Sequence, residues 1–95
     1  MSSRDTIEFD WDSGNIRHLK RHRVTPTEFE EVLMGEPVYL EYQTRDGEDR
    51  YKVVGMTKAG RVLVAVWAPR RGKVRAITAY AASRALRDLY GETCE

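Results

Sequence analysis

A change of hydrophobic period at Pro37 is the feature that most constrains how this chain can fold. Before Pro37, apolar residues recur at helical spacing, and after it they recur at about every second position. Four segments after Pro37 are rich in β-branched or aromatic residues, namely 38–42, 50–56, 61–68 and 73–80. Turns at Gly47, Gly60 and Gly72 separate them and are too short for crossover helices, so the sequence predicts an antiparallel meander.

The C-terminal part of the meander carries two further expectations. Segment 61–68 is apolar at nearly every position, so we expect both faces of this strand to be covered. A last helix is predicted from near Ser83 to Gly91, with Leu86, Leu89 and Tyr90 buried.

The N-terminal third predicts a short strand and two helices. Residues 7–11 alternate between apolar and polar, which is typical of a strand. Asp12 can cap a helix that runs to about Arg21, in which Ile16 and Leu19 form a narrow apolar stripe. In the stretch VTPTEF, Thr25 is the predicted N-cap of a second helix, and Glu28 completes a capping box.

These elements predict an α+β protein with the order β-α-α-β-β-β-β-α. An antiparallel sheet of four to five strands is packed with two N-terminal helices and one C-terminal helix. The 95 residues form a single domain, 1–95, without repeats or linkers.

Composition narrows the class of protein. Hydrophobic residues make up 41% and charged residues 33%, as in globular proteins, and no apolar run approaches the ~20 residues of a membrane span. The N-terminus lacks the apolar stretch of a signal peptide, and the lone Cys94 cannot form an internal disulfide. We expect a cytoplasmic protein that does not enter the membrane.

Charge is distributed unevenly along the chain. Residues 1–47 hold 6 Lys/Arg against 10 Asp/Glu, whereas residues 48–95 hold 10 against 5, which gives balances of −4 and +5. This asymmetry indicates a basic surface that could meet a polyanion, although small domains vary this much without such a partner.

The two histidines, His18 and His22, are four residues apart on the first predicted helix and share a side with Asn15. A packing role, contact with phosphate or proton transfer, and metal binding are all compatible with this spacing. A zinc site would need further ligands from Asp10, Asp12 or Cys94. We predict no metal and no cofactor.

Longer stretches carry a resemblance to a known family. FDWDSGNIRHLKRHRVTPTEFEEVL, GEDRYKVVGMTKAGRVLVAVWA and VRAITAYAASRALRDLYGE together resemble the BrnT toxins over residues 7–92, through the order and spacing of their motifs. The resemblance implies a RelE-like fold and a ribonuclease toxin of a type II toxin–antitoxin pair. It also implies a partner antitoxin that carries a DNA-binding domain and represses the operon.

The chain departs from the family pattern at three places. Met56 and Tyr80 stand where the family pattern has arginine, and Leu86 replaces the glutamate of a capping box. The alternative to a ribonuclease is therefore a protein of the same fold that is catalytically weakened or inactive and binds protein or nucleic acid.

Metal-independent RNA cleavage needs a base for the 2′-hydroxyl, cations around the phosphate and an acid for the leaving oxygen. The resemblance implies phosphate contacts by Arg50, Arg61 and Arg84, and a hydrogen bond that Tyr80 donates. It implies that the base is either Glu48 or Asp49. His22 is the implied acid.

Other basic residues suit sequence-independent contact with RNA phosphates. They are Lys58, near the position of Met56, and Arg70, Arg71, Lys73 and Arg75, at the last predicted hairpin. The hairpin cluster is equally what solubility would favour. Trp67 could stack on a base, but its apolar strand favours a place in the core.

Overall fold

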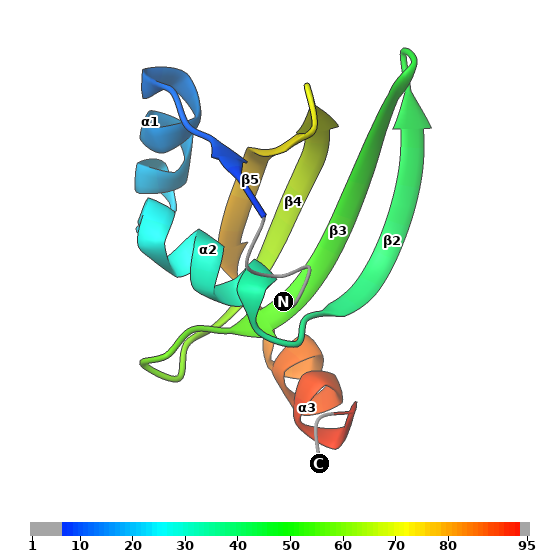
Figure 1. Cartoon of the computed structure of the whole chain (residues 1–95). Helices are drawn as coiled ribbons and strands as arrows, with labels where there is room; N and C mark the ends of the chain where they lie inside the picture. The colour runs from blue at the N-terminus through cyan, green and yellow to red at the C-terminus, as the bar shows by residue number, and fades with distance from the viewer. Residues whose placement is uncertain (1–6, 94–95) are drawn as a thin grey trace.

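The computed structural model describes residues 7–93, and its elements follow the predicted order (Figure 1). The protein is an α+β fold, as predicted. The elements are β1 (Phe9–Asp10), α1 (Ser13–Arg21), α2 (Pro26–Met34), β2 (Val38–Arg45), β3 (Glu48–Met56), β4 (Val62–Arg70), β5 (Lys73–Ala81) and α3 (Arg84–Thr93).

The five strands form one sheet in the order β1-β5-β4-β3-β2. The meander from β2 to β5 is antiparallel, as expected, but β1 pairs with β5 in parallel. Helices α1 and α2 lie between β1 and the meander in the chain. No tight turn therefore fixes the direction of β1 relative to its neighbour β5. The predicted antiparallel meander is confirmed, and the parallel strand β1 at its edge makes the five-stranded sheet mixed.

Two-residue turns extend the strands beyond their predicted ends. Asp46 and Gly47 both have positive φ (53° and 77°), as do Arg71 and Gly72 (55° and 79°). Two successive positive φ values match the type I′ turn, whose twist suits a β-hairpin. As a result β2 and β3 pair up to Arg45 and Glu48, which brings Glu48 into the sheet.

Capping interactions begin both N-terminal helices where the sequence predicts. Asp12 caps α1 by accepting a 2.8 Å hydrogen bond from the backbone N–H of Asn15, and the Asn15 side chain accepts one from the Asp12 N–H. Thr25 and Glu28 form the predicted capping box of α2.

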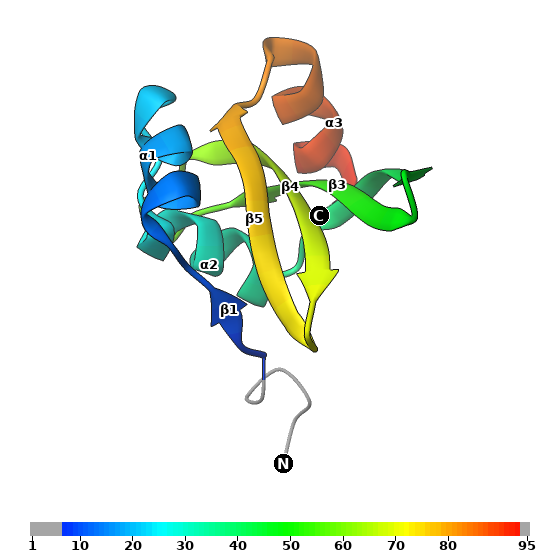
Figure 2. The same cartoon turned by 90° about the horizontal axis from the view of Figure 1, so that it is seen from above.

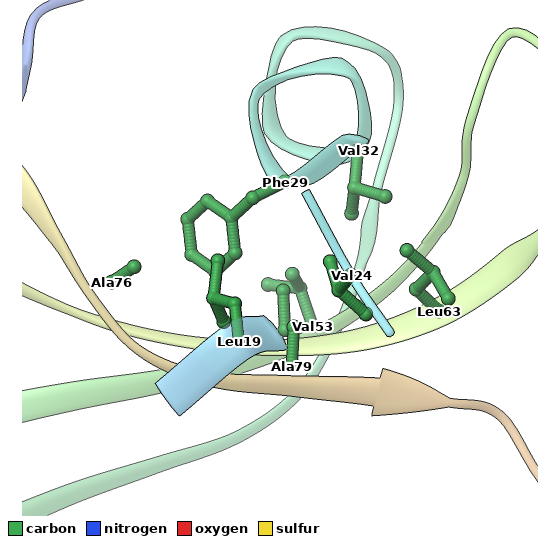
Figure 3. Packing of buried hydrophobic residues seen from close by; sticks show 9 residues of the cluster. Leu19, Val24, Phe29, Val32, Val53, Leu63, Ala76 and Ala79 are labelled. Carbon is green, nitrogen blue, oxygen red and sulfur yellow. The ribbon is translucent and has the colours of Figure 1, made fainter. Parts of the chain in front are cut away.

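The core lies between α1, α2 and one face of the sheet (Figure 3). Helix residues such as Leu19, Phe29 and Val32 pack onto Val53 and Leu63. A further set of small side chains from the sheet, Ala65, Ala76 and Ala79, lets the helices approach closely. A Cβ at Gly55 would lie 2.9 Å from the Val32 side chain, so helix α2 depends on this glycine.

Helix α3 lies on the other side of the sheet from α1 and α2 (Figure 2). Val54 and Val64 alternate with the core residues Val53 and Ala65 and are nonetheless fully buried, so this part of β4 is covered on both faces. Val66, on the same face as Val64, is only half-buried and lines a surface hollow, so the expectation that β4 is covered along both faces is confirmed only in part. Of the three residues predicted to be buried, Tyr90 is buried, Leu86 is half-buried and Leu89 is 45% exposed. The predicted burial of Leu89 is wrong because Leu86 and Tyr90 lie one turn apart and Leu89 lies to the side of this stripe. The helix also continues past Gly91 to Thr93.

Within residues 7–93, no helix is long and apolar enough to cross a membrane.

Candidate functional site

Two arginines from different strands meet at one carboxylate. Glu48 and Arg50 lie on β3, and the Arg50 Nε donates to Glu48 Oε2 at 3.0 Å. Arg75 lies on β5 and donates through Nη2 to the other oxygen of Glu48. Because β4 separates β3 from β5, the three side chains reach across it. We call this set the arginine cluster.

Electrostatics keeps Glu48 ionised. The hydrogen bond from Arg50 lowers the pKa of Glu48, and the hydrogen bond and charge of Arg75 act in the same direction against partial burial. All three side chains are about a quarter to a third exposed, so ligands can reach them. With two cations and one anion, the cluster carries a net positive charge.

The arginine cluster lies between two hollows of the protein surface. One, of about 300 Å³, lies on the sheet face opposite to α1 and α2, and the other, of about 350 Å³, lies between that face and the start of α1. Both are lined by Arg50 and Ile77. The first also contains Glu41, Gln43, Tyr51, Lys52, Val66 and Thr78, and the second Asp12, Gly14, Asn15, His18, Arg75 and Ala76.

The histidines extend the site along α1. His18 lines the second hollow, its ring centroid lies 5.7 Å from that of His22, and His22 lies 6.2 Å from the ring of Tyr80. Both histidines are exposed, so neither takes the packing role that the sequence left open. The sequence left phosphate contact or proton transfer open for both histidines but gave a specific catalytic role to His22 alone, and the spacing of His18 from Asn15 and His22 is the signal that placed it on the same side of the helix.

Within the part of the chain that the structure describes, His18 and His22 have no further side chains beside them that could complete a metal site. No group of three or more His, Cys, Asp or Glu side chains there is arranged to hold a metal ion. Asn15, on the same side of α1, is used in capping, and its amide also donates to the Asp10 carbonyl at 2.8 Å. Cys94 lies outside the described residues.

Arg61 lies far from the arginine cluster. Its backbone bonds to Thr57 at the end of β3, roughly 20 Å from Arg50 at the rise per residue of a strand. The guanidinium donates to Glu28 Oε2 at 2.8 Å and to the Arg23 carbonyl at 2.9 Å. Although partial burial opposes it, the hydrogen bonds from Thr25 and Arg61 lower the pKa of Glu28. These contacts join the β3–β4 turn to α2.

Three other predicted site residues also lie apart from the cluster. Lys58 is exposed in the β3–β4 turn, where its backbone N–H donates to Glu31 at 3.1 Å. Arg84 is exposed at the start of α3. Asp49, the alternative to Glu48 as a base, accepts hydrogen bonds from Tyr42 and Thr44 and alternates with Glu48 along β3, so it points to the other face.

The four basic residues of the last hairpin differ in their contacts. Arg70 forms an ion pair with Asp10 at 3.9 Å, and Lys73 forms one with Glu8 at 3.8 Å. Arg71 is exposed in the turn, and Arg75 belongs to the arginine cluster. The hairpin therefore does not gather all four charges into one patch.

Trp67 packs against the core, and its ring stacks on Tyr51 with centroids 4.6 Å apart. Trp67 is half-buried, so the predicted place in the core is confirmed only in part.

Residues 11–85 match the family model described as "Ribonuclease toxin, BrnT, of type II toxin-antitoxin system". The chain belongs to the BrnT family. A search among curated proteins gives no match. Membership places the chain in a family of ribonuclease toxins whose systems include an antitoxin.

Two of the three departures from the BrnT pattern, the missing arginines at Met56 and Tyr80, have a clear structural setting. Met56 is 45% exposed at the far end of β3, six residues from Arg50, so an arginine there would not join the arginine cluster. Tyr80 contacts His22 and lies on the strand that carries Arg75. Neither position is a member of the arginine cluster.

Proposed function

We propose that this BrnT-family chain is an endoribonuclease toxin that cleaves RNA without a metal ion. The observation that carries the proposal is the arginine cluster, two guanidiniums held side by side between two surface hollows. Guanidinium groups bind phosphate oxygens in pairs and stabilise charge that develops on a phosphate. They supply the positive charge for which other nucleases use a metal.

In the proposed reaction, a base takes the proton of the 2′-hydroxyl, and the 2′-oxygen attacks the adjacent phosphorus. The bond from phosphorus to the 5′-oxygen breaks as an acid protonates that oxygen, which leaves a 2′,3′-cyclic phosphate and a 5′-hydroxyl. Arg50 and Arg75 hold the phosphate throughout.

Proton transfer is assigned to the histidines, because imidazole both accepts and donates protons near neutral pH. His22, beside Tyr80, is the proposed acid, and His18, which lines the same hollow as Arg50 and Arg75, is the proposed base. Both oxygens of Glu48 already accept hydrogen bonds and its pKa is lowered, which makes it a weak base. We therefore propose that Glu48 positions the two arginines.

The remaining predicted residues take roles outside the chemical step. Arg61 holds the β3–β4 turn to α2 through Glu28, and Lys58, Arg70, Arg71, Lys73 and Arg84 contribute positive charge for RNA binding. We propose that a cognate antitoxin with a DNA-binding domain covers the arginine cluster with an acidic segment. The proposed RNA substrate favours a cytoplasmic location for this activity.

Binding without cleavage is the second candidate function. It is favoured by Tyr80, which offers a hydrogen bond but no charge where the family pattern has arginine. The arginine cluster alone would then hold RNA or the antitoxin.

The test is cleavage of a fluorescent single-stranded RNA in EDTA. Loss of a clamp residue commonly costs about 10²–10³ in rate, so Arg50→Ala and Arg75→Ala should each lower cleavage by that factor. Arg17→Ala, an exposed position on α1, is the matched control and should cleave like the wild type. Equal activity of all variants would refute the site, and binding of RNA without cleavage would favour the second candidate.

A further inference from the structure

Strand β2 forms one edge of the sheet (Figure 1). It is eight residues long, and within residues 7–93 only β3 pairs with it. A free edge offers unpaired backbone groups to another strand, and natural proteins often block it with charged side chains, with proline or with a β-bulge. The segment VYLEYQTR contains no proline, its bulge lies between Tyr39 and Glu41, and its two charges, Glu41 and Arg45, are of opposite sign. Residues 41–45 are therefore a regular and open edge.

The same strand carries an exposed aromatic surface. Tyr39 and Tyr42 are 58% and 56% exposed. Tyr42 packs on Tyr51 with ring centroids 5.1 Å apart, and Tyr51 stacks on Trp67. The aromatic row thus runs from the core to the open edge and ends there at Tyr42.

The charges of residues 41–45 are complementary to themselves. Glu41 and Arg45 lie two positions on either side of Gln43, and Tyr42 and Thr44 lie between. Suppose that β2 strands of two copies pair in an antiparallel manner, with Gln43 on the two-fold axis. Glu41 of each copy then lies opposite Arg45 of the other copy, which gives two ion pairs. A register centred on Tyr42 would place Glu41 opposite Gln43 and form neither ion pair.

We infer that β2 pairs with β2 of a second copy of this chain about Gln43, which makes one continuous ten-stranded sheet. The two Tyr42 rings then lie diagonally across the axis, on the side of the sheet that carries α1 and α2, where diagonal neighbours are within reach of aromatic rings. Glu41 and Arg45 form two ion pairs on the other side. Glu41 already lies 3.8 Å from Lys52, which places its carboxylate on the side of the arginine cluster.

The two-fold axis of such a pair is perpendicular to the sheet, so both copies present their arginine clusters on the same side. The pairing does not depend on RNA cleavage and is tested separately from it. A contact of about five residues per strand is small, which indicates a weak and reversible dimer.

The experiment is sedimentation equilibrium of the full chain from about 5 to 300 μM, a range that covers weak dimers. The wild type should show a monomer–dimer equilibrium. Glu41→Arg alone and Arg45→Glu alone each bring like charges together twice and should weaken dimerisation about tenfold or more. The matched control is Glu36→Arg, an exposed position before β2 with the same charge change, which should leave the dimer intact.

Two restorations distinguish strand pairing from loss of folding. The double variant Glu41→Arg, Arg45→Glu should dimerise again, and a mixture of the two single variants should form a mixed dimer. Thermal melts establish that each variant is folded. A monomeric wild type at all concentrations, a dimer that is insensitive to charge reversal, or failure of both restorations would overturn the inference. The inference would also be overturned if the β2 variants weakened binding of the antitoxin and left dimerisation unchanged.

Discussion

Glu28 and Arg61 are 33 residues apart in the chain, and their side chains meet at 2.8 Å. The contact joins the first turn of α2 to the residue that precedes β4. Arg61→Ala removes this contact and the bond to the Arg23 carbonyl. Because both side chains are partly exposed, we expect a loss of about 1 kcal/mol, which lowers the melting temperature by about 4–8 °C. Thermal denaturation at pH 7, with Arg17→Ala as control, measures it.

The same pair gives a pH dependence. The pKa of Glu28 is lowered from 4.5 in the folded protein, so its contribution to stability is present above that value and is lost as the pH falls through the folded pKa. Urea denaturation at pH 7 and below pH 4 should show a smaller acid-induced loss in Glu28→Gln than in the wild type. An equal loss in both proteins would contradict the role of this carboxylate.

A neutral side chain at Glu48 should separate RNA binding from RNA cleavage. Glu48→Gln raises the net charge of the arginine cluster by one, so RNA should bind at least as tightly. The amide holds the two guanidiniums less well, and cleavage should fall about tenfold. A fall of about 10²–10⁴ with a changed pH profile would instead mark Glu48 as the general base. The pKa of Glu48 is lowered by its hydrogen bonds to Arg50 and Arg75. Protonation of Glu48 should therefore not limit activity until the pH falls below the pKa of an ordinary glutamate.

Much of the fold could be predicted from local sequence signals. Thr25 and Glu28 begin α2 through contacts within one turn, and the Asp46-Gly47 and Arg71-Gly72 pairs define the hairpins. The parallel β1 could not be predicted, because its partner is 65 residues away and no turn fixes the direction.

The site was predicted as a set of residue types and less well as an arrangement. Arg50, Glu48 and Arg75 meet because of the register across β4, and this register shifts at a bulge between Val66 and Trp67. The sequence pattern does not reveal that shift. The resemblance grouped Arg61 with Arg50 by residue type, although the β3–β4 turn and Glu28 hold Arg61 at the other end of β3.

Salt dependence of RNA binding should distinguish free from paired cations. Each phosphate contact that is lost reduces the slope of log K against log salt by about 1. Arg71→Ala should reduce it by this amount, because among residues 7–93 Arg71 forms no ion pair. Arg70→Ala and Lys73→Ala should change it less, because Asp10 and Glu8 already neutralise these side chains. Equal effects of all three changes would contradict the ion pairs with β1.

The histidines give a prediction about metal. Purified protein should contain no stoichiometric zinc by elemental analysis, and EDTA should not change its melting temperature. One zinc per chain, lost together with stability in the variant His18→Ala, would show that α1 forms a metal site.

The most direct measurement compares an RNA oligonucleotide with the same sequence carrying 2′-O-methyl groups, both in EDTA. We predict that the wild type cleaves the RNA and leaves a 2′,3′-cyclic phosphate. It should bind the methylated strand without cutting it, and Arg50→Ala should weaken that binding. Cleavage of the methylated strand, cleavage only after a divalent metal is added, or binding that ignores Arg50 would contradict the account.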